Sequence, residues 1–156
     1  MEARLLEVFA HPLVRYGVGA LVVFVFLLFA LFFLPPLFAL AGPPPDLWVL
    51  GYRPEQVLSY LEALGEEGRR LYRLFLLADL GFAPLYGIAL SGWLYHRYRS
   101  AAYARWPLVA AALDLGENLL FLAALSGHAE GLFLAGYLTF FKWILILYSF
   151  FALLLP

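Results

Sequence analysis

Residues 106–125 read WPLVAAALDLGENLLFLAAL, and this stretch decides the class of the fold. Its length is about the 20 residues that an α-helix needs to cross the hydrocarbon core of a bilayer. Asp114, Glu117 and Asn118 interrupt the apolar run, and their spacing of three and four residues places them on one face of a helix. A span of this kind is expected to turn its polar face toward other helices and away from lipid.

Three further stretches have a similar length and apolar character. With the first they predict four spans, at about 13–34, 71–95, 106–125 and 132–155. The connections between the last three are short, which makes neighbouring helices antiparallel. We therefore expect an all-α, polytopic membrane protein, a four-transmembrane-helix bundle in which residues 1–156 form a single membrane domain.

The composition agrees with this class. Hydrophobic residues make up 65% of the chain and charged residues 13%, whereas soluble domains carry about 25% charged residues. A soluble globular domain and a nucleic-acid binder with a basic surface are both excluded. The chain has no cysteine, which excludes a disulfide scaffold, a thiol catalyst and a thiolate metal site.

The long connection between the first two spans has structure of its own. Pro35-Pro36 at its start predicts an end or a kink of the first span. Pro54 suits the first turn of a helix, and the apolar residues after it share one face, which predicts a short amphipathic helix over about 54–64. We expect this helix to lie on the membrane surface or across the mouth of the bundle.

Four ionisable side chains lie inside the predicted spans: Asp79, Asp114, Glu117 and Lys142. A charge at the middle of a bilayer costs at least about 2.5–3.5 kcal/mol. Counted at about 1.5 Å per residue from the ends of the spans nearer the long connection, all four lie at one level, roughly 12–16 Å deep. We expect them to face one another or a wet cavity.

Other polar side chains of the spans fall on the same faces. They are Tyr72 and Tyr86, which share a stripe with Asp79, and Thr139, one turn before Lys142. The first span has no polar residue between Gly19 and Leu34. We therefore expect the first span to pack outside the polar core and to shield it from lipid.

The charges of this core do not balance, because three carboxylates face one ammonium group. We expect Lys142 to pair with Glu117 or Asp114, since an unpaired charge in a low-dielectric core is severely unfavourable. The remaining acids then carry a proton or meet a positive group. Candidates for that group are a cationic ligand, a metal ion, or an arginine reaching down from the outer rim: Arg69, Arg70 or Arg73.

Four short motifs carry a resemblance to a known group: GxxGRxxY at 65–72, D…P…Y at 79–86, DxxEN at 114–118 and TxxK at 139–142. This pattern resembles a group of small uncharacterised bacterial four-span integral membrane proteins. The resemblance covers residues 50–145 and implies that these positions belong to one unit, but it implies no activity.

A second resemblance is one of architecture alone. The chain is similar in this respect to the emopamil-binding/sigma-2-receptor group, small helical membrane proteins that use acids in the bilayer to hold amine-bearing or sterol-like amphiphiles. No motif matches residue by residue.

We expect a multi-pass protein of the bacterial inner membrane. The connection 96–105 carries three arginines and no acid, which places both termini in the cytoplasm and the long connection outside.

The leading hypothesis is an outward-opening polar pocket inside the membrane that binds a lipid-like or prenyl-type amphiphile. An extension of this hypothesis is that the protein also modifies the bound molecule. Asp79 and Glu117 would act as acid and base if a reaction occurs. The other residues predicted to bind the ligand are Tyr72, Tyr86, Asp114, Asn118, Thr139, Lys142, Arg69, Arg70 and Arg73; a phosphate would suit the three arginines.

Two other hypotheses stay open. Asp79, Glu117 and Lys142 could relay protons or cations in transport, or the charged cluster could lock the helices of a structural or assembly subunit. The expected partner is a membrane lipid or an amphiphilic ligand. Nucleic acid is not expected as a partner, a homo-oligomer is left open, and no cofactor and no resident metal site are predicted.

Overall fold

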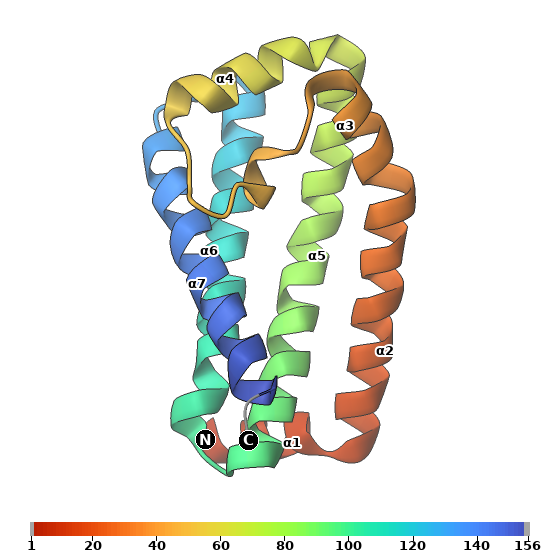
Figure 1. Cartoon of the computed structure of the whole chain (residues 1–156), viewed down its shortest axis with the longest axis vertical. Helices are drawn as coiled ribbons and strands as arrows, with labels where there is room; N and C mark the ends of the chain where they lie inside the picture. Colours follow the sequence, from red (N-terminus) through yellow and green to blue (C-terminus); the bar gives the residue numbers. More distant parts are fainter. Residues whose placement is uncertain (1, 155–156) are drawn as a thin grey trace.

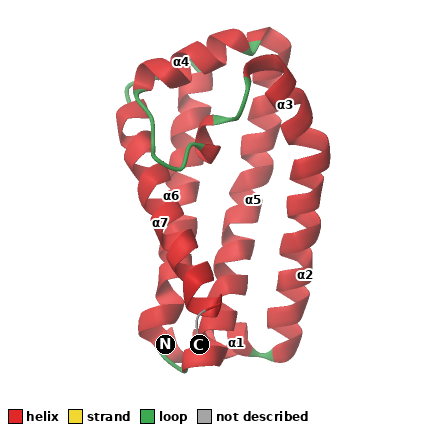
Figure 2. Ribbon diagram, viewed as in Figure 1, coloured by secondary structure: helices red, strands yellow, loops and turns green. Residues whose placement is uncertain are grey.

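Four long apolar helical segments run side by side along the molecule (Figure 1). The computed structural model describes residues 2–154, with the side chains from residue 4 onward. The segments are α2 (Pro12–Leu28) continued by η1 (Phe29–Phe33) and α3 (Leu34–Ala41), then α5 (Gly65–Tyr98), α6 (Ala101–Leu125) and α7 (Leu132–Leu154). Each is long and apolar enough to cross a membrane. Since the described residues contain no strand (Figure 2), the protein is an all-α four-helix bundle, as predicted.

The spans pack in a chain of neighbours. The α5 helix packs against α6 and α6 against α7, while α2 packs against the other side of α5. In the most apolar part of the first segment only 6% of the residues are buried, against 44% for α5. The expectation that the first span packs on the outside is therefore confirmed.

Two short helices cover the ends of the bundle. The α1 helix (Glu2–Ala10) lies at the end that holds both termini (Figure 1). It packs against α5 at Gly92, where any Cβ atom would collide with the carbonyl of Phe9. The α4 helix (Pro54–Ala63) lies across the opposite end, which confirms the predicted loop helix. Between α3 and α4 the chain folds back into the bundle and forms the single turn η2 (Pro45–Leu47).

The sequence predicts that the first span ends or kinks at Pro35-Pro36. The predicted end at Leu34 is wrong, because the helix continues to Ala41. The segment η1, a wider π-helical turn, precedes the prolines. In this turn the Leu34 N–H donates to the carbonyl of Phe29, five residues back. The wider turn makes room for the rings of Pro35 and Pro36, which would clash with the preceding turn of a regular α-helix. These two residues also have no backbone N–H to donate.

Other boundaries also extend beyond the apolar runs. The α5 helix begins at Gly65 instead of residue 71, and α6 begins at Ala101 instead of residue 106. The basic connection expected over 96–105 shrinks to Arg99 and Ser100, because charged residues continue a helix readily once it leaves the membrane. Residue 155, the expected end of the fourth span, lies outside the described residues.

Candidate functional site

An ion-paired core joins α6 to α7. The Lys142 Nζ atom lies 2.6 Å from Asp114 Oδ1 and 2.5 Å from Glu117 Oε2. All three side chains are buried. The expected pairing of Lys142 with Glu117 or Asp114 is confirmed for both acids. One ammonium group therefore shares its positive charge between two carboxyl groups.

Hydrogen bonds from neutral groups extend this core. The Tyr86 hydroxyl donates to Asp114 Oδ2 over 2.9 Å, and Thr139 Oγ1 donates to Glu117 Oε1 over 2.5 Å. Asn118 Nδ2 donates to Asp79 Oδ2 over 2.8 Å, which connects α6 to α5. Side chains of three spans therefore form one polar layer, as their depths and faces predict.

Glycines let the backbones approach closely enough for these contacts. At Gly87 on α5, a Cβ atom would lie 2.8 Å from the Cβ atom of Ala111 on α6. This close crossing brings Tyr86 within reach of Asp114. At Gly136 on α7, a Cβ atom would lie 2.6 Å from the carbonyl oxygen of Tyr52, so only glycine lets the folded-back connection rest on α7.

Asp46 is a fourth acid of this region, and sequence reasoning missed it. It lies in η2, is buried, and its carboxylate Oδ1 has no hydrogen-bond partner among the described residues. Trp143 Nε1 donates to its main-chain carbonyl over 2.8 Å. Burial raises the pKa of Asp46 to about 6, against a smaller lowering by Lys142.

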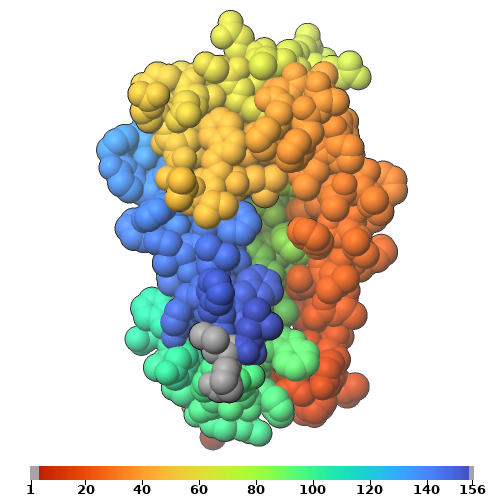
Figure 3. All heavy atoms as spheres, in the orientation of Figure 1, coloured from red at the N-terminus to blue at the C-terminus, as the bar shows by residue number. Residues whose placement is uncertain are grey.

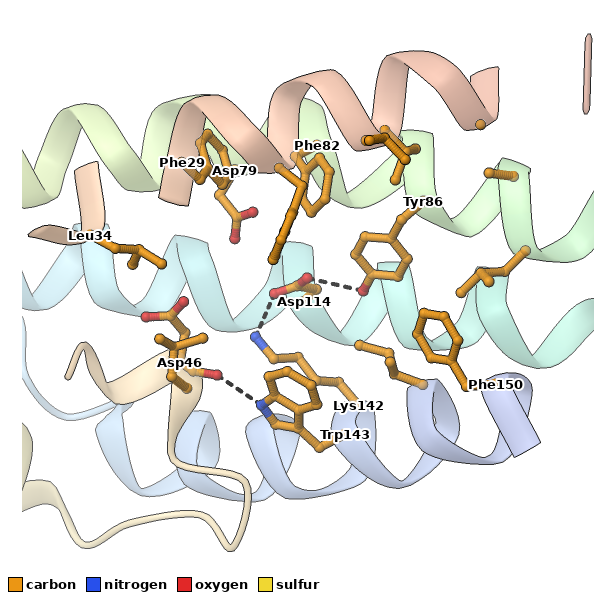
Figure 4. A pocket seen from close by; sticks show the side chains of 18 of the residues that line it. Phe29, Leu34, Asp46, Asp79, Phe82, Tyr86, Asp114, Lys142, Trp143 and Phe150 are labelled. Atoms are coloured by element: carbon orange, nitrogen blue, oxygen red, sulfur yellow. Dashed lines mark hydrogen bonds and ion pairs between the residues drawn. The ribbon is translucent and has the colours of Figure 1, made fainter. Parts of the chain in front are cut away.

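A cavity of about 530 Å³ lies between α2, α5 and α7 (Figure 4). Most of its wall is aliphatic and aromatic, and Phe26, Phe82 and Ile146 are examples. Polar side chains gather in one part of it, where they point toward a shared space: Asp46, Asp79, Tyr86, Asp114 and Lys142. The cavity thus offers polar and ionisable groups in one part and an apolar lining along the rest.

The cavity lies along a furrow between the first and the last span. In Figure 3, atoms of α5 are visible at the bottom of a furrow whose two banks are α2 and α7. This differs from the expected opening toward the outside. The α4 helix and the folded-back connection lie across that end of the bundle (Figure 1).

The predicted site residues fall into three groups. Asp79, Tyr86, Asp114 and Lys142 line the cavity. Glu117, Asn118 and Thr139 are buried behind them and reach the cavity only through their hydrogen bonds. A third group lies elsewhere: Tyr72, Arg69, Arg70 and Arg73.

Tyr72 belongs to an aromatic cluster. Its ring lies 5.5 Å from that of Tyr60 and 6.1 Å from that of Phe121. Its hydroxyl is buried and has no hydrogen-bond partner among the described residues. Tyr72 therefore packs below α4 and does not line the cavity.

The three arginines bind other parts of the chain. Arg69 donates to the carbonyl of Leu61 over 2.6 Å, and Arg73 donates to the carbonyl of Leu125 over 3.2 Å. Arg70 pairs with the exposed Glu66 at 2.6 Å. The structure therefore does not bring these arginines to the polar core. They lie in the first turns of α5, at the end of the bundle that α4 covers.

Arg15 on α2 is buried, and the sequence analysis did not single it out. Its guanidinium lies 4.6 Å from the ring centre of Trp93 and 4.8 Å from that of Tyr16. Trp93 also lines the cavity. No periodic signal in the sequence distinguishes Arg15 from an ordinary arginine at the end of a span.

Comparisons of the chain with models of protein families, with curated proteins and with solved structures find no match. Among the described residues, no group of three His, Cys, Asp or Glu side chains is placed to hold a metal ion.

Proposed function

We propose that this protein binds a lipid-like amphiphile within the membrane. The observation that carries the proposal is the division of the cavity, which has ionisable side chains in one part and apolar walls along the rest. The polar head would meet Asp79 and Lys142, and the apolar chain would lie in the furrow between α2 and α7. A ligand with one polar and one apolar end matches such a site, because the polar residues bind its head and the apolar walls bind its chain.

The length of the furrow supports a chain-like ligand. Its lining along the first span runs from Gly19 to Leu34. At about 1.5 Å per residue, this interval is roughly 22 Å long. An extended hydrocarbon or prenyl chain therefore has room along the helix axis.

The weak attachment of the first span supports access from the bilayer. Between Gly19 and Leu34 its side chains are all apolar or absent, so it makes no polar contact along the furrow. Apolar contacts between helices gain little over contacts with lipid tails, because both environments are apolar. A lipid chain can therefore take the place of α2 side chains at little cost.

The acids would share the recognition of the head unequally. Asp79 lines the cavity and accepts one hydrogen bond from Asn118, whereas Glu117 lies behind Lys142. If the bound molecule is modified, Asp79 is placed to exchange a proton with it, and Glu117 would act only through Lys142. We place the protein in the bacterial inner membrane because its four motifs resemble those of small bacterial four-span membrane proteins. We place the termini in the cytoplasm because Arg97, Arg99 and Arg105 lie at the junction of α5 and α6.

Native mass spectrometry of the detergent-purified protein tests the proposal without any added ligand. The wild type should retain an amphiphile as a discrete added mass. Gly19→Phe should lose it, because a ring at this position fills the furrow next to Trp93. Gly17→Phe is the matched control, since Gly17 lies on the same helix, does not line the cavity and has open space around it.

The polar end is tested in the same experiment with Asp79→Asn, which should weaken retention while the protein stays folded. If the wild type carries no added mass, or if Gly19→Phe and Gly17→Phe retain the same mass as the wild type, the proposal is wrong. The charged core would then serve as a lock between helices.

A further inference from the structure

A continuous chain of contacts crosses the core from the folded-back connection toward the cavity. It begins at Tyr52, whose hydroxyl lies 3.1 Å from Thr139 Oγ1. Thr139 lies 2.5 Å from Glu117 Oε1, and the other oxygen of Glu117 lies 2.5 Å from Lys142 Nζ. Every step so far is within hydrogen-bond distance.

The chain continues on the other side of the lysine. Lys142 Nζ lies 2.6 Å from Asp114 Oδ1, and Asp114 Oδ2 accepts from the Tyr86 hydroxyl over 2.9 Å. Lys142, Asp114 and Tyr86 all line the cavity. The chain therefore ends at the space proposed above for the polar head, although its existence does not depend on any ligand.

The other end of the chain reaches the surface. Tyr52 lines a recess of about 350 Å³ beside α7, together with the exposed Tyr137. Thr139 and Glu117, the next two members, are fully buried. The recess and the cavity are thus separate spaces that these side chains connect.

The donors and acceptors have one consistent order. Thr139 Oγ1 lies 2.5 Å from Glu117 Oε1, 3.0 Å from the carbonyl of Ala135 and 3.1 Å from the Tyr52 hydroxyl. An ionised Glu117 is the nearest and strongest of these acceptors, so the single hydroxyl proton of Thr139 points to it. The Tyr52 hydroxyl must then donate to Thr139, which leaves its own oxygen free to accept a proton from water in the recess. Hydroxyl groups that donate on one side and accept on the other can pass protons along.

We propose that Tyr52, Thr139, Glu117, Lys142 and Asp114 form a proton path from the surface recess to the cavity. A proton from water binds the Tyr52 oxygen as Tyr52 gives its own proton to Thr139, and Thr139 gives its proton to Glu117. Lys142 passes one proton to Asp114 and takes the proton of Glu117 in return. One proton enters from water, one arrives at the cavity, and no other bond changes.

The charged and titratable groups around this path come from every packed element. They are Asp46 on η2, Tyr60 on α4, Tyr72, Asp79 and Tyr86 on α5, Asp114 and Glu117 on α6, and Lys142 on α7. Asp46 and Asp79 line the same cavity as Asp114, the acid that receives the proton. The path would therefore set the charge that the cavity presents.

Infrared spectroscopy after a rapid drop in pH tests the path on the whole protein in lipid nanodiscs. The carboxylic acid band that Asp114→Asn removes is followed with time, because Asp114 is the acid that holds the proton at the cavity end of the path. Tyr52→Phe keeps the ring, which lies 5.7 Å from that of Phe121, and removes only the hydroxyl. The band should then rise on the order of a hundredfold more slowly, the lower range of what a positioned proton-transfer group contributes.

Tyr137→Phe is the matched control, since Tyr137 lines the same recess, directly follows Gly136 on α7 and makes no hydrogen bond with Thr139 among the described residues. It should respond as fast as the wild type. Thr139→Ser should keep the wild-type rate and Thr139→Val should lose it, which separates the hydroxyl from a packing role. Equal rates in Tyr52→Phe and the wild type, or no pH response of the band in the wild type, would overturn the proposal.

Discussion

The two sides of the cavity are held together by different forces. On the side of α6 and α7, Lys142 contacts two buried acids, and each of these acids accepts a further hydrogen bond. On the side of α2, the wall between Gly19 and Leu34 has no polar side chain at all.

This difference has a consequence inside a bilayer. A buried charge that loses its partner is costly in an apolar medium, whereas an apolar side chain that exchanges a helix for a lipid tail loses little. The side of α6 and α7 is therefore fixed, and the side of α2 is replaceable. A binding site for an amphiphile needs both properties, a fixed place for the head and an adaptable place for the chain.

Removal of the lysine should break the fixed side. Lys142→Met leaves Asp114 and Glu117 buried without their cation, which costs about 3–5 kcal/mol of unfolding free energy. We expect a large drop of the melting temperature in detergent. Adding Asp114→Asn and Glu117→Gln to Lys142→Met should restore most of it, because no unpaired charge remains.

The control for this loss is an ion pair of the same length at the surface. Arg70 and Glu66 also lie 2.6 Å apart, but both are largely exposed. Arg70→Met should therefore change the melting temperature little, since exposed pairs contribute about 0–1 kcal/mol. Similar melting of Lys142→Met and Arg70→Met would refute the distinction.

Asp46 should make the free energy of unfolding depend on pH. The dependence is expected between the pKa of Asp46 in the unfolded chain and its higher pKa in the folded protein. Burial raises its pKa from 3.8 in the unfolded chain to about 6. The folded state then binds more protons than the unfolded state in this window, so the free energy of unfolding falls as the pH rises through it. The fall amounts to about 3 kcal/mol at 1.36 kcal/mol per pKa unit.

Melting curves at a series of pH values check this expectation. Asp46→Asn should remove the fall and melt at a higher temperature than the wild type above pH 6. A pH dependence that is unchanged in Asp46→Asn would mean that Asp46 does not titrate as its burial implies.

The smallest effect on stability is expected on the replaceable side. A Cβ atom at Gly19 would meet only Trp93 Nε1, at 3.8 Å. Gly19→Phe should therefore change the free energy of unfolding by no more than about 0.5 kcal/mol, because the half-buried Gly19 faces open space in the cavity and the ring displaces no packed side chain. Loss of the bound amphiphile with unchanged melting would sharpen the contrast between the two sides, whereas strong destabilisation would show that α2 is tightly packed.

The sequence predicts the spans and the polar layer for clear physical reasons. Twenty apolar residues and a shared helix face follow from the period of the helix, so the contacts of Lys142 with Asp114 and Glu117 could be anticipated. The ends of the helices could not, because charged residues such as those near Arg97 continue a helix as readily as they end it.

The rest of the site depends on tertiary folding that leaves no periodic pattern. Asp46 reaches the cavity because the connection after α3 folds back and rests on Gly136. The prediction that Arg69 and Arg73 bind a ligand at the rim of the pocket rests on their spacing. In the structure they donate instead to backbone carbonyls at the ends of α4 and α6. Neither backbone position can be inferred from residue spacing alone.

Photocrosslinking with a phospholipid that carries a diazirine on its acyl chain tests the central claim most directly. In nanodiscs, residues on the bilayer-facing side of α2, such as Leu21 and Phe24, should be labelled in any case. If a lipid chain occupies the furrow, the label should also appear on Phe82 and Leu90 of α5, which line the cavity. Labelling confined to the bilayer-facing residues, with none on α5 in the furrow, would contradict an intramembrane binding site for an amphiphile.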